Sequence, residues 1–147
     1  MKPKFIDYFM KFAELTASLS YAKRLQVGAV IVKGDQTIGT GYNGMPSGWE
    51  NTCEYTVDDA MGYDTGKTKP EVLHSEMNAL MKVAKSTESS NGAVMFCTHA
   101  PCMDCAKAIY QSGIVTLYYQ EEYRSTQGVE FLKKSGVNVI KYEPRNK

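Results

Sequence analysis

The sequence has no long uncharged apolar run and no cluster of basic residues. Its N-terminal apolar stretch is interrupted by Asp7, Lys11 and Glu14, so we expect neither a secretion signal nor a membrane-spanning helix. The 17 lysines and arginines are dispersed and nearly balanced by 16 acidic residues. Proteins that bind nucleic acid usually carry a basic stripe, because neutralising phosphates supplies much of their affinity. We therefore expect neither membrane nor nucleic acid as a partner.

Cysteine and histidine are also scarce, with four and two copies. Without an export signal we expect a cytoplasmic protein, and in that compartment thiols stay reduced and disulfides are rare. Cys53, Cys97, Cys102 and Cys105 are therefore interpreted as metal ligands or buried thiols.

The 147 residues are of ordinary globular composition, with 43% hydrophobic and 22% charged side chains. A chain of this length can bury one hydrophobic core but is too short for two cores of sufficient size. Residues 1–147 are therefore expected to form a single domain.

Hydrophobic periodicity and turn residues predict alternating helices and strands. The predicted strands are 27–32, 37–42, 93–97, 114–119 and 137–140, and the predicted helices run over 5–19, from Pro70 to about 84, from Pro101 to about 112, and over 126–135. Residues 43–69 show no sustained period, and long irregular inserts in small domains are more often functional than idle. This order of elements favours an α/β fold in which helices cover both faces of a mixed sheet.

Two of the predicted helices have an apparent apolar face. In the first helix that face comprises Phe5, Tyr8, Phe9, Phe12, Leu15 and Leu19. In the second it comprises Met77, Leu80, Met81 and Ala84. We expect these faces to pack against the sheet.

Two cysteines three positions apart, Cys102 and Cys105, form the most informative short motif. They could be a redox dithiol, two inert buried thiols or half of a metal site. With His74 they would make three ligands of a tetrahedral zinc site, and an open fourth position distinguishes catalytic from structural zinc. Glu76 stands close enough to act on a zinc-bound water. A redox dithiol would leave both His74 and Glu76 unexplained.

His74-Ser75-Glu76, followed after 24 residues by Pro101-Cys102-Met103-Asp104-Cys105, resembles the H-x-E…P-C-x-x-C signature of the zinc-dependent nucleoside and nucleotide deaminases. The resemblance implies a three-layer α/β/α cytidine-deaminase-like fold with a five-stranded mixed sheet. It also implies a catalytic Zn²⁺ held by His74, Cys102 and Cys105. Glu76 would be the catalytic residue that takes a proton from water and returns protons to the ring nitrogen and the departing ammonia.

Three further segments resemble the deoxycytidylate (dCMP) deaminase branch of that family. They are the loop GTGYNGMPSG at 39–48, the stretch RLQVGAVIV at 24–32, and the spacing of Tyr119, Tyr123 and Arg124. This resemblance implies hydrolytic deamination of dCMP to dUMP, which feeds thymidylate synthesis.

The same resemblance implies nucleotide-binding roles. Asn43 is expected to hydrogen-bond the sugar, and the loop at Gly44 to bring backbone N–H groups to a substrate or effector phosphate. Arg24 and Arg124 are the first candidates to meet the phosphate charge, and Tyr119 is expected to flank the base. The alternatives are a local cap for Asn43, a plain turn at Gly44 and a core position for Tyr119. The other candidate cations are Lys23, Lys67 and Lys69.

Relatives in this branch imply further partners. A homo-oligomer is expected, with a hexamer favoured, and dCTP and dTTP are the expected activator and inhibitor, with Mg²⁺ accompanying the nucleotide effector. Some relatives hold a second, structural zinc, and Cys53 matches one of its positions. Because Val72 stands where a histidine would be needed, only the catalytic ion is expected here.

Other functions remain open at this point. The same chemistry could act on dCTP, cytidine or adenosine in tRNA, or the chain could be a non-catalytic, zinc-stabilised nucleotide sensor. The lack of a basic stripe argues against tRNA, and the loop at 39–48 argues against free cytidine. Glu76 argues against a sensor, which has no need of a proton carrier.

Overall fold

A computed structural model describes residues 1–60 and 64–145, so residues 61–63 of the segment expected to be irregular lie outside the description. The elements are α1 (Pro3–Ala17), β1 (Gly28–Lys33), β2 (Gln36–Tyr42), α2 (Val57–Ala60), α3 (Ser75–Ala84), β3 (Val94–His99), α4 (Met103–Gln111), β4 (Thr116–Glu121), α5 (Gln127–Lys134) and β5 (Asn138–Lys141). The predicted order of helices and strands is confirmed, with α2 as an addition.

The strands form one mixed sheet in the order β2-β1-β3-β4-β5. β1 pairs antiparallel with both β2 and β3, whereas β3, β4 and β5 run parallel to one another. The first two strands form a hairpin, whose turn places Gly34 at a φ of 66°, a conformation that glycine adopts without steric cost. The five-stranded mixed sheet is therefore as predicted.

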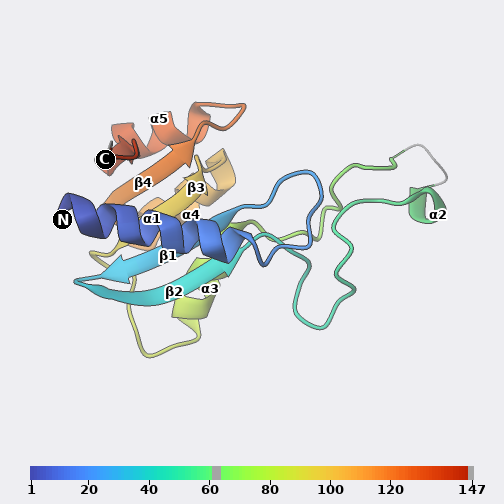
Figure 1. The fold of residues 1–147 in the computed structure, drawn as a ribbon, viewed down its shortest axis with the longest axis horizontal. Coiled ribbons are helices and arrows are strands. Elements are labelled where there is room, and N and C mark those ends of the chain that lie inside the picture. Colours follow the sequence, from blue (N-terminus) through green and yellow to red (C-terminus); the bar gives the residue numbers. More distant parts are fainter. Residues whose placement is uncertain (61–63, 146–147) are drawn as a thin grey trace.

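Helices cover both faces of this sheet unequally (Figure 1). α1 packs on one face, against the side chains of Val30, Phe96 and Tyr118. α3, α4 and α5 pack on the other face, over a core that includes Ile31, Met95, Cys97 and Leu117. β1 contributes to both cores and is buried over five of its six residues, as its uninterrupted apolar sequence predicts.

The predicted apolar face of α1 is largely wrong. Tyr8, Leu15 and Leu19 are 58–69% exposed. Phe9 is buried as predicted, but the other buried residues of the helix are Met10, Ala13, Thr16 and Ala17. The reason is close packing on the sheet, because a Cβ at Gly28 would collide with the backbone of Ala13 and Ala17. Only small residues allow so close an approach between a helix and a strand.

The predicted face of α3 is wrong in part for the same reason, although Leu80 is buried as predicted. Met81 and Ala84 are exposed, and the helix buries Ser75, Glu76, Ala79, Leu80 and Val83. The small residues at 75 and 79 lie against Gly39 and Gly41 of β2.

Two helices also begin later than predicted. α3 begins at Ser75 instead of Pro70, because Leu73 first pairs with Gly44 in an isolated β-bridge. α4 begins at Met103, with Cys102 as its extended N-cap residue, so Pro101 precedes the helix and does not occupy its first position.

The insert between β2 and α3 extends away from the sheet and carries the short helix α2 at its far end (Figure 1). Within the insert, Glu54 and Thr68 form a second isolated bridge that joins its two sides. Among the residues described, no helix has both the length and the apolar character needed to cross a bilayer.

Candidate active site

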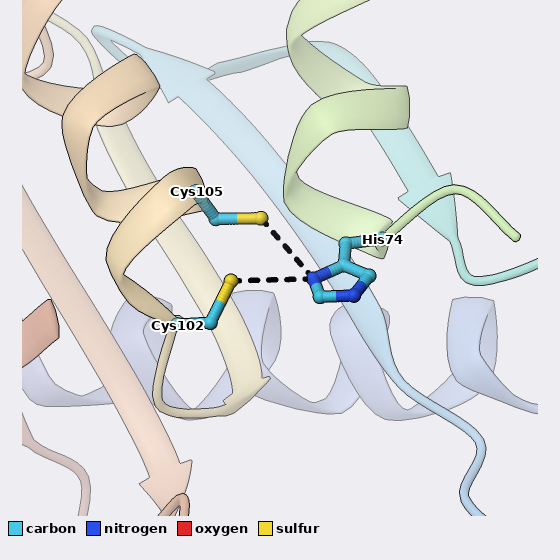
Figure 2. Close-up of side chains that lie close together, drawn as sticks. All are labelled: His74, Cys102 and Cys105. Carbon is cyan, nitrogen blue, oxygen red and sulfur yellow. Dashed lines mark hydrogen bonds between the residues drawn. The ribbon is translucent and has the colours of Figure 1, made fainter. Parts of the chain in front are cut away.

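The starts of α3 and α4 bring the predicted metal ligands together. His74 is the N-cap residue of α3, Cys102 is the N-cap residue of α4, and Cys105 lies in the first turn of α4. Both cysteine sulfurs lie 3.4 Å from Nδ1 of His74, and Figure 2 shows the two thiols and the ring pointing toward one point. Nδ1 is therefore the nitrogen that faces the site.

This donor set fits a zinc ion. The three ligand atoms lie within 4.8 Å of one another. Tetrahedral zinc with Zn–S bonds of about 2.3 Å and Zn–N bonds of about 2.0 Å separates sulfur and nitrogen by about 3.5 Å, close to the observed spacing. Within residues 1–60 and 64–145, no other group of three or more potential ligand residues brings its ligand atoms this close together.

The two cysteines have opposite pKa shifts. The pKa of Cys102 is lowered to about 4, mainly because the Cys105 thiol and then the His74 ring hydrogen-bond its sulfur. The pKa of Cys105 is raised by the bond to Cys102 and by burial. The Cys102 sulfur in turn raises the pKa of His74. The Cys105 thiol and the His74 ring thus favour the thiolate form of Cys102, and thiolate is the form in which cysteine binds zinc.

Glu76 occupies the first turn of α3 and is only 4% exposed. Burial raises the pKa of its carboxyl group, and a hydrogen bond donated by the Ser75 hydroxyl opposes that rise. A carboxyl group with a raised pKa can both accept and release a proton nearer neutral pH.

A cleft of about 710 Å³ opens over this cluster. Its lining includes three of the expected nucleotide-binding residues, Arg24, Asn43 and Arg124, together with His74, Glu76 and Cys102. A cleft of this volume is in the range of small-molecule sites. The structure therefore brings most of the expected site residues to one place.

Gly44 and Tyr119 are not among the residues that line the cleft. The Gly44 N–H donates to the carbonyl of Leu73, the contact that sets the chain just before His74. Tyr119 is 6% exposed and packs with Ala100 and Val129. Its hydroxyl donates to Glu122.

Asn43 lies in the cleft wall, where its side chain also holds the backbone. Its Oδ1 accepts the Val27 N–H at 2.8 Å, and its Nδ2 donates to the Leu25 carbonyl at 2.7 Å. These two bonds agree with the alternative in which Asn43 is a local cap of the backbone. They leave the second lone pair of Oδ1 free to accept another hydrogen bond.

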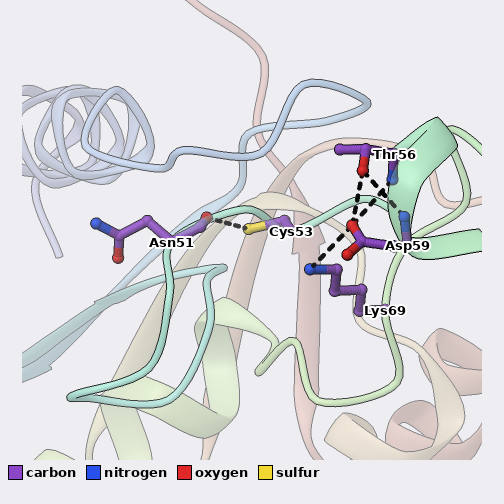
Figure 3. A network of polar contacts seen from close by, with 5 residues as sticks. All are labelled: Asn51, Cys53, Thr56, Asp59 and Lys69. Carbon is purple, nitrogen blue, oxygen red and sulfur yellow. Dashed lines mark hydrogen bonds and ion pairs between the residues drawn. The ribbon is translucent and has the colours of Figure 1, made fainter.

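The candidate cations fall into two groups. Lys67 pairs with Asp64 at 3.6 Å, and Lys69 pairs with Asp59 at 3.8 Å, an interaction visible in Figure 3. Among the described residues, Arg24 and Arg124 form no ion pair. Arg124 instead lies over the Tyr123 ring at 5.7 Å.

Glu54 and His99 also line the cleft, and neither belongs to a sequence motif that would single it out. Glu54 comes from the irregular insert, and its position depends on tertiary contacts. His99 precedes the Pro101-Cys102 motif, and burial lowers the pKa of its ring. Cys53 is 1% exposed and hydrogen-bonds the Asn51 carbonyl.

A mixed sheet that presents a His/Cys/Cys cluster and a buried glutamate at two helix starts defines the class of zinc-dependent deaminases. Residues 3–121 match the family model described as the cytidine and deoxycytidylate deaminase zinc-binding region. The chain belongs to this family.

Individual relatives support this family membership. The chain is 35% identical to ComE operon protein 2 of Bacillus subtilis over 141 residues, covering 93% of this chain and 70% of that protein. It is 34% identical to the deoxycytidylate deaminase of Homo sapiens over 152 residues, covering 95% and 80%. It spans about half the length of the yeast deoxycytidylate deaminases that it matches.

Among solved structures, the chain resembles the dCMP deaminase from the cyanophage S-TIM5 in complex with dCMP and dUMP. The TM-score is 0.89 at 46% identity, covering 97% of this chain and 99% of that one. The predicted cytidine-deaminase-like fold is confirmed.

Proposed function

We propose that this chain catalyses the hydrolytic deamination of dCMP to dUMP, and so supplies dUMP for thymidylate synthesis. The observation that carries the proposal is the match, over 97% of the chain, to a dCMP deaminase in complex with dCMP and dUMP. It is supported by the cleft, which places a metal-ligand cluster, a buried glutamate and two exposed arginines around one volume.

His74, Cys102 and Cys105 are the residues that would hold the catalytic zinc. When bound, zinc supplies a water activated for attack near neutral pH. The chain's own contribution begins with Glu76, whose burial excludes bulk water and raises its pKa. Its carboxylate accepts one proton from the attacking water and delivers it to the ring nitrogen. It then takes the proton of the hydroxyl added to the ring carbon and delivers it to the departing amine, which leaves as ammonia.

Arg24 and Arg124 are proposed to bind the substrate phosphate. Both are exposed at the cleft, and guanidinium groups bind phosphate oxygens through paired hydrogen bonds. Tyr123 supports Arg124 through the stacking contact.

Asn43 is proposed to contact the sugar through the free lone pair of Oδ1, while it continues to hold Val27. Gly44 and Tyr119 would act from outside the cleft wall. Gly44 orders the backbone before His74, and Tyr119 supports the end of β4 through its packing with Ala100 and Val129.

We further propose a cytoplasmic homo-oligomer, with a hexamer favoured, that responds to dCTP and dTTP with Mg²⁺ as the nucleotide's counter-ion. Large apolar side chains exposed on α1 and the following segment support association between copies: Phe5, Tyr8, Leu15, Leu19, Tyr21 and Leu25. Exposed apolar patches commonly mark protein interfaces. Sedimentation velocity on the purified protein, with a chain mass of 16.4 kDa, measures the assembly directly.

The proposed function is tested by ammonia release from dCMP, CMP, cytidine and dCTP, each with and without added dCTP and Mg²⁺. We expect dCMP to react fastest. Turnover of another nucleotide with inert dCMP would overturn the substrate assignment but leave the chemistry standing. No reaction with any of them, at full zinc occupancy, would favour the sensor alternative.

A further inference from the structure

Glu54 is a buried carboxylate in the cleft wall with no part in the proton transfers. It is 7% exposed, and among the described residues it has no ion-pair partner. Burying a charge is costly unless hydrogen bonds compensate it. Here backbone N–H groups compensate it: Lys23 N–H donates to Oε2 at 3.0 Å and Arg24 N–H donates to the same oxygen at 3.3 Å.

The segment that receives this carboxylate has no regular structure of its own. Residues 18–27 connect α1 to β1, and Arg24 lies in the middle with its side chain exposed. On the C-terminal side of Arg24, the Asn43 side chain fixes the backbone through its hydrogen bonds with Leu25 and Val27. Arg24 is therefore held between two side chains that come from different parts of the chain.

Glu54 is itself well anchored. It forms the bridge with Thr68, and the neighbouring backbone is paired through Lys69 N–H to the Cys53 carbonyl at 2.8 Å and Tyr55 N–H to the Lys67 carbonyl at 2.9 Å. Figure 3 shows the Asp59–Lys69 contact that joins the two sides of this insert. The insert thus presents a rigidly placed acceptor to a segment that would otherwise lack one.

We infer that Glu54 is a positioning residue that fixes the backbone at Lys23 and Arg24, and so directs the Arg24 guanidinium to the 5′-phosphate of the substrate. The inference rests on the proposed function. Because the carboxylate binds the backbone of Arg24 and not its guanidinium, it orients the arginine without neutralising it. The irregular insert therefore contributes to selection of a phosphorylated nucleotide over a nucleoside.

The test is Glu54→Gln, which keeps the size of the side chain but removes the charge that strengthens both hydrogen bonds. It also puts an NH₂ group in place of Oε1, which accepts the Lys23 N–H at 3.2 Å. We expect kcat/KM for dCMP to fall about 10- to 100-fold, mainly through KM, as expected for loss of a charge-assisted phosphate contact. For deoxycytidine, which lacks the phosphate, kcat/KM should change less than about threefold. Glu50→Gln, an exposed glutamate of the same insert, is the matched control and should change neither value.

A double-mutant cycle with Arg24→Ala separates positioning from a general structural role. If Glu54 acts through Arg24, the double variant should be no worse on dCMP than Arg24→Ala alone. Equal losses on dCMP and deoxycytidine, or losses that multiply in the double variant, would overturn the inference. An unchanged KM for dCMP in the Arg24→Ala variant would instead show that Arg24 does not bind the substrate phosphate.

Folding and zinc content are measured for each variant by circular dichroism and metal analysis. Should Glu54→Gln fail to fold, Glu54→Asp keeps the charge and both oxygens but withdraws them by one methylene. The same preferential loss on dCMP is expected there, and an unchanged preference for dCMP would overturn the inference. Inert dCMP in the wild-type enzyme would refute the proposed function itself, which is a different outcome.

Discussion

Glu76 is the residue at which burial and chemistry are most closely linked. Only 4% of it is exposed, and its pKa is raised because a buried carboxylate is poorly solvated. The Ser75 hydroxyl donates to one of its oxygens, which fixes the orientation of the carboxyl group. A proton carrier must be well oriented and must be able to take up a proton as well as release it. The bond from Ser75 provides the first, and the raised pKa favours the second.

We predict that Glu76→Gln retains the fold and zinc but loses turnover. Glutamine keeps the size of the side chain and its bond with Ser75, but it cannot accept the proton. A drop in kcat of at least about 10²- to 10⁴-fold is expected from loss of general acid–base catalysis, measured by ammonia release alongside zinc content. Glu71→Gln, an exposed glutamate outside the cleft, is the control. Near-normal turnover by Glu76→Gln would refute its assignment.

The four cysteines should differ in reactivity according to burial and metal binding. Cys102 is half-buried, whereas Cys53, Cys97 and Cys105 are buried. We predict that zinc protects Cys102 from iodoacetamide and that a chelator exposes it first, as peptide mass spectrometry would detect. Cys97, which is fully buried, serves as the internal control and should stay unmodified in both samples. Equal labelling of Cys102 with and without zinc would contradict its role as a ligand.

At the scale of elements, the sequence predicted where helices and strands lie better than which face each helix buries. Leu15 and Met81 belong to apolar stripes yet are exposed, while Ala13 and Ala79 are buried. Periodicity measures hydrophobicity, but the contact with β1 and β2 is decided by size. Glycines in those strands leave no room for a larger side chain. The identity of the partner strand, which a single helix sequence does not contain, therefore determines the buried face.

The contact between β2 and α3 gives a direct test of this view. A Cβ at Gly41 would lie closer than 3.0 Å to backbone atoms of Ser75 and Ala79. Because backbone cannot move aside as a side chain can, Gly41→Ala should lower the free energy of unfolding by about 1–3 kcal/mol. It should also reduce kcat/KM, since α3 carries Glu76.

Gly44→Ala is the matched control for stability. A Cβ there would meet only the Tyr42 ring, at 3.8 Å, so its unfolding free energy should stay within about 0.5 kcal/mol of wild type. Urea unfolding of both variants measures the difference. Equal stability of Gly41→Ala and wild type would show that the helix can shift without cost.

A polar contact joins α1 to the segment after β5. The Asp7 carboxylate accepts hydrogen bonds from the Tyr142 hydroxyl, at 2.8 Å, and from Arg145. The bond from Tyr142 is the main cause that lowers the pKa of Asp7 below its ordinary value of 3.8. A lowered folded-state pKa stabilises the fold above the unfolded pKa, and this contribution is lost as the pH falls through the folded pKa.

Asp7→Asn should therefore be less stable than wild type at pH 7, and the difference should shrink as the pH falls below about 3.8. Urea unfolding of metal-free protein at several pH values measures this without interference from zinc loss. Asp35→Asn, an exposed aspartate in the β1–β2 turn, is the control and should follow wild type throughout. A difference that is constant with pH would mean that the charge of Asp7 contributes nothing.

For the molecule as a whole, the sequence predicted the fold and the metal cluster because both depend on local signals. His74, Cys102 and Cys105 stand at helix starts that short motifs mark. The cleft wall is different, because Glu54 reaches it from an insert without periodicity and Tyr119 turns into the core. Such placements follow from which segments pack together. The sequence alone therefore predicted the metal-ligand cluster and the position of Glu76, but only part of the proposed nucleotide-binding surface.

The ligands come from two helices that are separated in the chain by β3, so zinc binding should stabilise the whole molecule. A metal that binds only the folded state stabilises it by an amount that grows with its free concentration, about 4 kcal/mol at a thousand times Kd. For a chain of this size that corresponds to a rise in Tm of about 8–16 °C. In scanning calorimetry, we predict that a chelator lowers the Tm by this amount and that added zinc restores it. His74→Ala should melt close to metal-free wild type and gain little from zinc. A gain equal to that of wild type would mean that the stabilising ion binds somewhere other than between α3 and α4.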